Sequence, residues 1–138
     1  MNASFGAFQK PQAALLLLRW TLAILMLLHG IAKLSGGVEG IGGMLQGAGL
    51  PSFIAYGAYI GEVVAPLMLL AGLLVVPAAL VIAFNMVMAI VLAHSSHLFA
   101  LTDNGGWRLE LQAFFLVSAI VVAMTTRVAG AQWGPGRV

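Results

Sequence analysis

Four polar side chains interrupt a sequence that otherwise carries almost no charge, and each lies in a separate hydrophobic stretch. The four are Lys33, Glu62, His94 and Glu110. An ammonium group, an imidazole and two carboxylates can exchange protons and form hydrogen bonds, which is the chemistry of general acids and bases. A charged group inside lipid costs several kcal/mol unless it is paired or hydrated, so such residues in membrane helices indicate a functional site.

The composition predicts that the solvent of this chain is lipid. Of its 138 residues, 62% are hydrophobic and only 7% are charged, and the mean hydropathy is +1.05. Soluble domains carry about 25% charged residues. The apolar residues also form long runs rather than the spacing of an amphipathic helix. We therefore expect a single membrane domain over residues 1–138, in contact with a lipid bilayer.

Charge and cysteine usage exclude several classes of function. The net charge of +2 is small and scattered, so nucleic acid is not an expected partner. The chain has no cysteine, which excludes disulfides, thiolate metal sites and Cys-X-X-Cys redox relays. The first apolar run holds Arg19, His29 and Lys33 and ends without a small-residue cleavage pattern, so we do not expect it to be a secretory signal peptide.

Four apolar runs predict four transmembrane helices. They cover about residues 13–34, 53–74, 78–98 and 108–128, and each is close to the roughly 20 residues that cross a hydrocarbon core. Backbone groups in lipid must be hydrogen-bonded within the segment, which favours helices. The expected fold is therefore an all-α integral membrane four-helix bundle with both termini on one side.

The segment between the first two runs, residues 35–51, contains seven glycines. Apolar residues between Val38 and Leu45 nevertheless follow helical spacing, which predicts a short interfacial helix over the mouth of the bundle. Glycine weakens such a helix, so a plain surface loop is an equal alternative. In the second run, Pro66 lacks a backbone donor and is expected to bend the helix just after Glu62. A simple packing kink is the alternative there.

Lysine and arginine counts predict the orientation in the membrane. The basic residues on the terminal side are Lys10, Arg19, Arg127 and Arg137. The loop side carries Lys33 and Arg108, offset by Glu39, Asp103 and Glu110. The positive-inside rule then places both termini in the cytoplasm, as in a multi-pass protein of the bacterial cytoplasmic (inner) membrane.

Counting along the helices brings several polar residues to a similar depth near the outer side. His29 and Lys33 are four residues apart and share a helical face, and Glu62 lies near mid-depth in the second helix. We expect one outward-facing, ligand-binding pocket that gathers His29, Lys33, Glu62, His94 and Glu110. Lys33 is the opposite charge nearest in depth to Glu62, which predicts an interaction between these two residues.

Most of these residues also have an interpretation without a ligand. Lys33 can extend to the lipid head groups, Glu110 can be an acidic residue in the first turn of a helix, and His94 can lie at the interface. Glu62 is the hardest to explain in this way, because a carboxylate in the middle of a membrane helix needs a partner or a proton.

Three further polar residues have roles suggested by their helical positions. Asn85 and His94 are nine residues apart and fall on opposite faces of a straight helix, and small residues on the Asn85 face favour that face as the inner one. Arg19 and Asn85 are assigned structural roles, Arg19 as a cytoplasmic-side anchor or as a contact of Asn85. Tyr59, three residues before Glu62, shares its face and can donate a hydrogen bond to it, so it joins the pocket.

The order of these motifs resembles a known family. The first helix reads RWTLAILMLLHGIAKL, the next section GLPSFIAYGAYIGEVVAPLMLLAG and the third MVMAIVLAHSSHLFA, and Gly-Gly-Trp precedes Glu110. This succession resembles the DoxX family of small four-helix membrane proteins over roughly residues 14–125. No single piece is specific, but the ordered combination is. Family members often end the fourth helix with Gly-Pro-Gly-Arg, which here stands at residues 134–137, after an intervening TTRVAGAQ.

The resemblance implies that His29, Lys33, Glu62, His94 and Glu110 are motif positions. The family takes its name from a subunit linked to quinone-dependent oxidation of sulfur compounds. The resemblance therefore favours a quinone-linked redox component, with a quinone and a membrane or periplasmic redox protein as its partners. A shared fold is associated with a function but does not establish it. Whether the protein is an enzyme stays open.

Three other functions stay open at this point. His29, His94 and the carboxylates offer a weaker haem or metal site, because they lack the Glu-X-X-His spacing of di-metal centres in bundles, and no metal ligand is assigned. A transporter or proton pathway for a small solute needs an oligomer, because polar groups on one side of four short helices form a poor path. In a non-enzymatic assembly or stabilising subunit of a membrane complex, the polar cluster only holds helices together.

Overall fold

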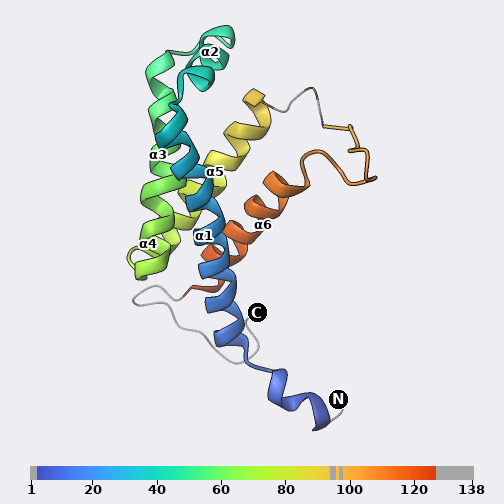
Figure 1. Ribbon diagram of the computed structural model, residues 1–138. Helices are drawn as coiled ribbons and strands as arrows, with labels where there is room; N and C mark the ends of the chain where they lie inside the picture. Colours follow the sequence, from blue (N-terminus) through green and yellow to red (C-terminus); the bar gives the residue numbers. More distant parts are fainter. Residues whose placement is uncertain (1–2, 94–95, 97, 127–138) are drawn as a thin grey trace.

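The computed structural model of the chain describes residues 3–93, 96 and 98–126 (Figure 1). Within these residues the structure is helical and contains no named strand, which confirms the predicted all-α fold. The elements are η1 (Ala3–Phe8), α1 (Pro11–Gly36), α2 (Glu39–Gly47), η2 (Ser52–Tyr56), α3 (Gly57–Tyr59), η3 (Ile60–Val64), α4 (Ala65–Ala71), α5 (Val75–Ala93) and α6 (Glu110–Thr125).

In the part of the chain that the structure describes, three helical segments are long and apolar enough to span a membrane. They are Pro11–Gly36, Ser52–Ala71 and Val75–Ala93. α6 is also apolar but has 16 residues, so at about 1.5 Å per residue it is shorter than the roughly 30 Å hydrocarbon core. Large apolar side chains such as Phe84 and Phe114 are mostly exposed, as residues that face lipid are. The fold is therefore the expected bundle of an integral membrane protein.

The second spanning segment is continuous from η2 to α4 but changes its winding around Glu62. The backbone N–H of Ala65 bonds to the carbonyl oxygen of Ile60, five residues earlier, so η3 is a turn of π-helix. Pro66 accounts for this turn, because it has no N–H to donate to the carbonyl oxygen of Glu62 and its ring does not fit a regular α-turn. Glu62 thus lies in the π-turn of this segment, and such turns are frequent at functional sites.

A tight turn, residues 72–74, joins α4 to α5. Gly72 ends α4 with a φ of +75°, the left-handed conformation that favours glycine after a helix. Arg19 of α1 lies against this turn, because a Cβ on Gly72 would stand 3.7 Å from Arg19 Nη2. Asn85 is about 15 Å further along α5, so the suggested contact between Arg19 and Asn85 is not formed.

The hydrophobic core occupies the half of the bundle that holds the C-terminal part of α6 and the turn between α4 and α5. There α1 packs against α4 and α6, and α5 packs against the same two helices. Its most deeply buried residues include Met26, Leu69, Ile82, Ala119 and Val122. Alanines in this core let the helix backbones approach one another closely, as is usual in membrane bundles.

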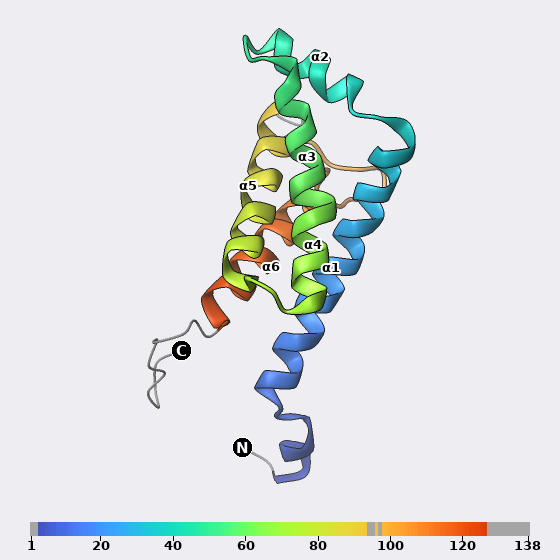
Figure 2. The same ribbon diagram turned by 90° about the vertical axis from the view of Figure 1, so that its left-hand side faces the viewer.

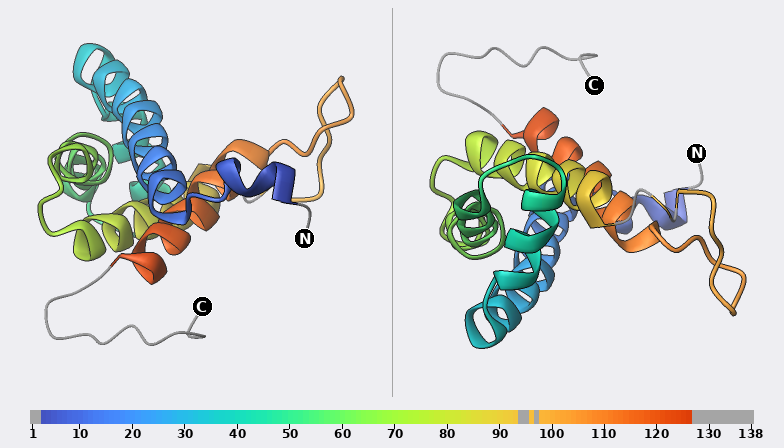
Figure 3. Two further views of the ribbon diagram at one scale, coloured as in Figure 1. Left: turned by 90° about the horizontal axis from the view of Figure 1, so that it is seen from below. Right: turned by 90° about the horizontal axis from the view of Figure 1, so that it is seen from above.

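At the other end of the bundle the helices diverge. The C-terminal part of α5 and the N-terminal part of α6 turn away from α1 and α3 (Figure 1). α2 lies at this end beside the tops of α1 and α3 (Figure 2), where Val38, Leu45 and Ala55 form a second small core. The view from above shows α2 across the end of the bundle (Figure 3). Lys33 and Glu62 lie in this open half of the molecule, whereas Arg19 lies at the other end, against the turn of residues 72–74.

Candidate functional site

The site is built around an ion pair between the first two spanning segments. Lys33 Nζ lies 2.6 Å from Glu62 Oε1, and the side chains are 27% and 6% exposed, respectively. A hydrogen bond between two charged groups at this distance is strong. Burial makes the pair costly to form and still more costly to break, because the remaining charge would have no partner. The interaction predicted from the depth of the two residues is therefore present.

Gly30 allows α1 to come close enough for this pair to form. A Cβ at Gly30 would collide with the backbone carbonyl of Glu62 and would stand 2.7 Å from Val63 Cγ2. Gly30 is three residues before Lys33 and so lies one turn away on nearly the same face of α1. The absence of a side chain at this position brings the backbone of α1 onto η3, and the Lys33 ammonium then reaches Glu62.

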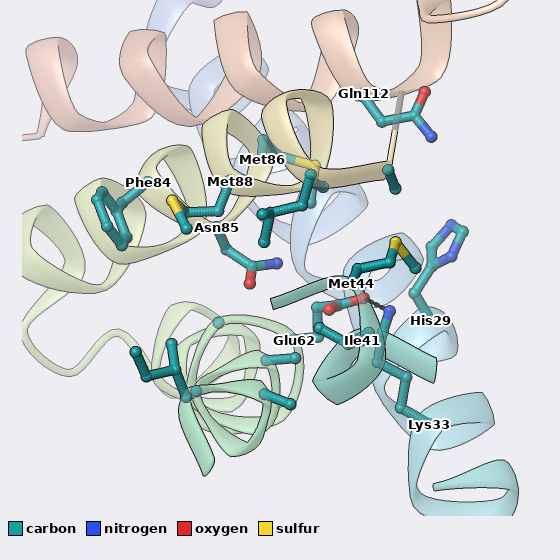
Figure 4. Close-up of a pocket in the computed structure, with 18 of the residues that line it drawn as sticks. His29, Lys33, Ile41, Met44, Glu62, Phe84, Asn85, Met86, Met88 and Gln112 are labelled. Carbon is teal, nitrogen blue, oxygen red and sulfur yellow. Dashed lines mark hydrogen bonds and ion pairs between the residues drawn. The ribbon is translucent and has the colours of Figure 1, made fainter. Parts of the chain in front are cut away.

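Gly61 likewise allows α5 to come close to η3, on the side away from α1. A Cβ at Gly61 would lie 2.7 Å from both Cβ and Cγ of Asn85, so Asn85 packs directly on the backbone beside Glu62. The Asn85 amide points from α5 toward Glu62 (Figure 4). It is half-buried, and within the described part of the chain it makes no hydrogen bond. Its donors and acceptor therefore remain available to a bound molecule.

These residues face a cavity of about 500 Å³ in the open half of the bundle. This volume falls within the range of about 300–1,000 Å³ that small-molecule sites occupy. The walls come from α1, α2, α5, α6 and the stretch from η2 to η3. The polar side chains that line it are His29, Lys33, Glu62, Asn85 and Gln112. The remaining wall is apolar and includes Met26, Met44, Met86 and Met88, whose flexible side chains adapt to different ligand shapes.

His29 lies on the side of the cavity that α1 shares with α6. Its ring packs edge-on against Phe115, with 5.7 Å between ring centroids and 82° between ring planes. The side chain is otherwise exposed, so its ring nitrogens can donate or accept hydrogen bonds at the edge of the cavity.

Tyr59 has a different partner from the one expected. Its hydroxyl donates to the backbone carbonyl oxygen of Lys33 at 3.2 Å, and not to the Glu62 carboxylate. Tyr59 does not line the cavity. This hydrogen bond joins α3 to the end of α1 and so helps to fix the backbone that carries the Lys33 side chain.

The structure does not bring every predicted residue into the cavity. Glu110 begins α6, is exposed and does not line the cavity. Its carboxylate lies beside Gly106, where a Cβ would stand 2.8 Å from Glu110 Oε2. An acidic residue in this first turn is favoured by the helix dipole, which was the alternative explanation for this residue. His94 lies outside the described residues.

Gln112 and the methionines of the cavity wall had no place in the predicted pocket. Gln112 lies on α6, two residues after Glu110, and a polar amide in an apolar helix was the signal that could have identified it. Within the described residues, no group of three or more histidine, cysteine, aspartate or glutamate side chains is arranged to hold a metal ion.

The structure is thus an all-α membrane bundle with a buried ion pair on the wall of a largely apolar cavity. The family model for DoxX matches residues 14–95 of the chain, which is more than half of its length. The chain therefore belongs to the DoxX family. The matched region contains both members of the ion pair, and Glu110 lies beyond it. A comparison with curated proteins found no match, and a comparison with solved structures also found none.

Proposed function

We propose that this DoxX-family protein binds the head group of a membrane-dissolved quinone in its cavity and acts as a component of a quinone-linked redox system. The observation that carries the proposal is the Lys33–Glu62 ion pair on the wall of an apolar cavity of about 500 Å³. A quinone ring is flat and apolar and has two carbonyl oxygens at opposite ends. Such a molecule suits an apolar cavity that has a few hydrogen-bonding groups at fixed positions.

The polar groups of the cavity complement both redox forms of a quinone. The Lys33 ammonium has three donors, and the bond to Glu62 uses one of them. The other donors of Lys33 and the amide of Asn85 can bind the carbonyl oxygens of the oxidised ring. The Glu62 carboxylate and the Asn85 carbonyl can accept from the hydroxyl groups of the reduced ring. One set of side chains therefore serves either form.

Reduction of a quinone takes up two electrons and two protons, and reoxidation releases them. Lys33 and Glu62 can hold and pass protons at the ring oxygens. The chain contributes no thiolate ligands for an iron–sulfur cluster, because it has no cysteine. The proposal therefore includes a redox partner protein, in the membrane or on its outer side, as the source or acceptor of the electrons. Both termini are proposed to lie on the cytoplasmic side of the inner membrane.

The binding of quinone to protein in lipid nanodiscs tests this proposal. The probe is a radiolabelled dimethoxymethylbenzoquinone, and the quinone retained by empty nanodiscs is subtracted. We expect Glu62→Gln and Asn85→Leu to weaken binding by about tenfold or more, which is about 1.4 kcal/mol. Leucine retains a branched Cγ that can pack on Gly61, so Asn85→Leu removes the amide with little change of shape.

Asp103→Asn is the matched control, because it makes the same change from carboxylate to amide in the exposed loop outside the cavity. It should bind like the wild type. Retention by the wild-type protein that is no higher than that of empty nanodiscs would overturn the proposal.

A stabilising subunit without a ligand is the second candidate, because the ion pair also joins α1 to η3 across the close contact at Gly30. The two functions differ at Asn85, whose amide makes no hydrogen bond within the described part of the chain. If the polar groups only hold helices together, Asn85→Leu will alter neither assembly nor quinone binding. A loss of binding in a folded Asn85→Leu protein supports the quinone site.

A further inference from the structure

One side of the cavity is open where α3 and α5 separate. α5 packs against α4 and η3, but it makes little contact with α3 and η2. The two segments come close at Gly61, which lies against Asn85. Beyond this point α5 runs away from the second spanning segment (Figure 1, Figure 3), and the wall of the cavity on this side is incomplete.

Residues on both sides of the contact between Gly61 and Asn85 belong both to the cavity and to the outer surface. Ile54, Val81 and Phe84 line the cavity, yet they are 39%, 37% and 67% exposed. Gly57 also lines the cavity, and a Cβ at this position would have no atom within 4 Å. We refer to Ile54, Gly57, Val81 and Phe84 as the lateral opening.

The lateral opening lies at the depth of the membrane. Its residues fall within the spanning segments Ser52–Ala71 and Val75–Ala93. No side chain in the opening is polar. The medium outside the opening is therefore lipid, and a route through it suits molecules that are already dissolved in the bilayer.

Polarity increases from the lateral opening to the interior of the cavity. Phe84 lies on one side of the view in Figure 4, and Lys33 and His29 lie on the other, beyond Asn85 and Glu62. At the end of the bundle, Ile41, Met44 and Leu45 of α2 add apolar side chains to the cavity wall. A molecule with a polar head and an apolar tail can thus place its head on the ion pair while its tail extends through the opening.

From this arrangement we infer that the ligand is an amphiphile with a long apolar tail, that it reaches the cavity sideways from the lipid through the lateral opening, and that its tail remains between α3 and α5. The inference rests on the proposed function for the position of the head group. It adds the chemical class of the tail, the route, and four residues that determine which tails are accepted. A ring without a tail would occupy only the inner part of the cavity.

Substitutions of Gly57 test the inference. Gly57→Trp fills the lateral opening from a position where an added Cβ has no atom within 4 Å, so the helix should still fold. Gly57→Leu is a smaller version of the same change and serves if the tryptophan variant fails to fold. Gly40→Trp is the matched control, because Gly40 lies in α2, also has no atom within 4 Å of an added Cβ, and does not line the cavity.

The probes are radiolabelled dimethoxymethylbenzoquinone and the same ring with a decyl chain that ends in a photoreactive diazirine. In nanodiscs, Gly57→Trp should weaken binding of the decyl probe by about tenfold or more and change binding of the bare ring by less than about twofold. Illumination of the wild-type protein should attach the tail to the residues of the lateral opening, and Gly57→Trp should abolish these adducts. Gly40→Trp should behave like the wild type.

The outcomes separate the inference from the function on which it rests. If both probes bind the wild-type protein and Gly57→Trp leaves the affinity for the decyl probe unchanged, the lateral route is overturned and the head-group site stands. Tail adducts on the opposite side of the cavity, at Leu111 of α6, would also overturn it. If neither probe binds the wild-type protein, the proposed function fails, and the inference fails with it.

Discussion

At the scale of single residues, the Lys33–Glu62 pair combines a structural and a chemical role. Removing one charge leaves the other without its partner in a largely apolar environment, whereas removing both leaves two neutral groups that can still form a hydrogen bond. We expect Lys33→Gln and Glu62→Gln each to lower the free energy of unfolding by about 3 kcal/mol. The double variant should lose less than either single variant. Reversible unfolding in mixed micelles measures these differences, and strictly additive losses would contradict the pairing.

For these residues, the sequence predicted the depth in the membrane better than the direction in which each side chain points. Lys33 and Glu62 were expected to interact because they are opposite charges at similar depth, and they do. Glu110 has a similar depth but does not line the cavity, because depth does not determine where a side chain points at the first residue of a helix. The hydroxyl of Tyr59 donates a hydrogen bond to a backbone carbonyl of another helix. Such a partner depends on helix packing that a single sequence does not reveal.

At the scale of the elements, two glycines on neighbouring helices determine how closely the spanning segments approach at η3. Gly30→Ala adds a methyl group that would collide with the Glu62 carbonyl, so α1 must move away and the ion pair must lengthen. We expect a loss of about 2 kcal/mol in the free energy of unfolding and weaker quinone binding. Gly36→Ala is the control in the same helix, because an added Cβ there has no atom within 4 Å.

Chemical unfolding and the nanodisc assay together test this expectation. Gly36→Ala should change stability by less than about 0.5 kcal/mol. Equal effects of the two substitutions would mean that the contact between α1 and η3 is not tight.

The helices themselves were easier to predict than their details. Long apolar runs and the backbone requirements of lipid determine an all-α membrane bundle, and the structure confirms it. Pro66 indicated a disturbance after Glu62, but not that it would take the form of a π-turn. η3 packs between α1 and α5, and because these contacts are distant in the sequence, the sequence alone does not reveal how the backbone accommodates the proline.

At the scale of the whole molecule, the proposed orientation places the open half of the bundle toward the outer side of the membrane. The chain has no cysteine, so single cysteines can report the orientation without a background. In intact cells, Asp103→Cys should react with a membrane-impermeant maleimide, whereas Gln9→Cys should react only after permeabilisation, because basic residues are retained on the cytoplasmic side. The reverse pattern would place the cavity, and therefore its redox partner, on the cytoplasmic side.

The short turn between α4 and α5 has a mechanical consequence for this molecule. Residues 72–74 hold the two helices together at the end of the bundle far from the cavity, and the contact of Asn85 with Gly61 holds α5 against the second spanning segment again at the cavity. α5 ends at Ala93, eight residues or about 12 Å beyond Asn85, so a tilt of about 5° at this contact moves its end by about 1 Å. We therefore expect small changes in packing at this contact to change the width of the gap between α3 and α5, and with it the access that the lateral opening gives from the lipid.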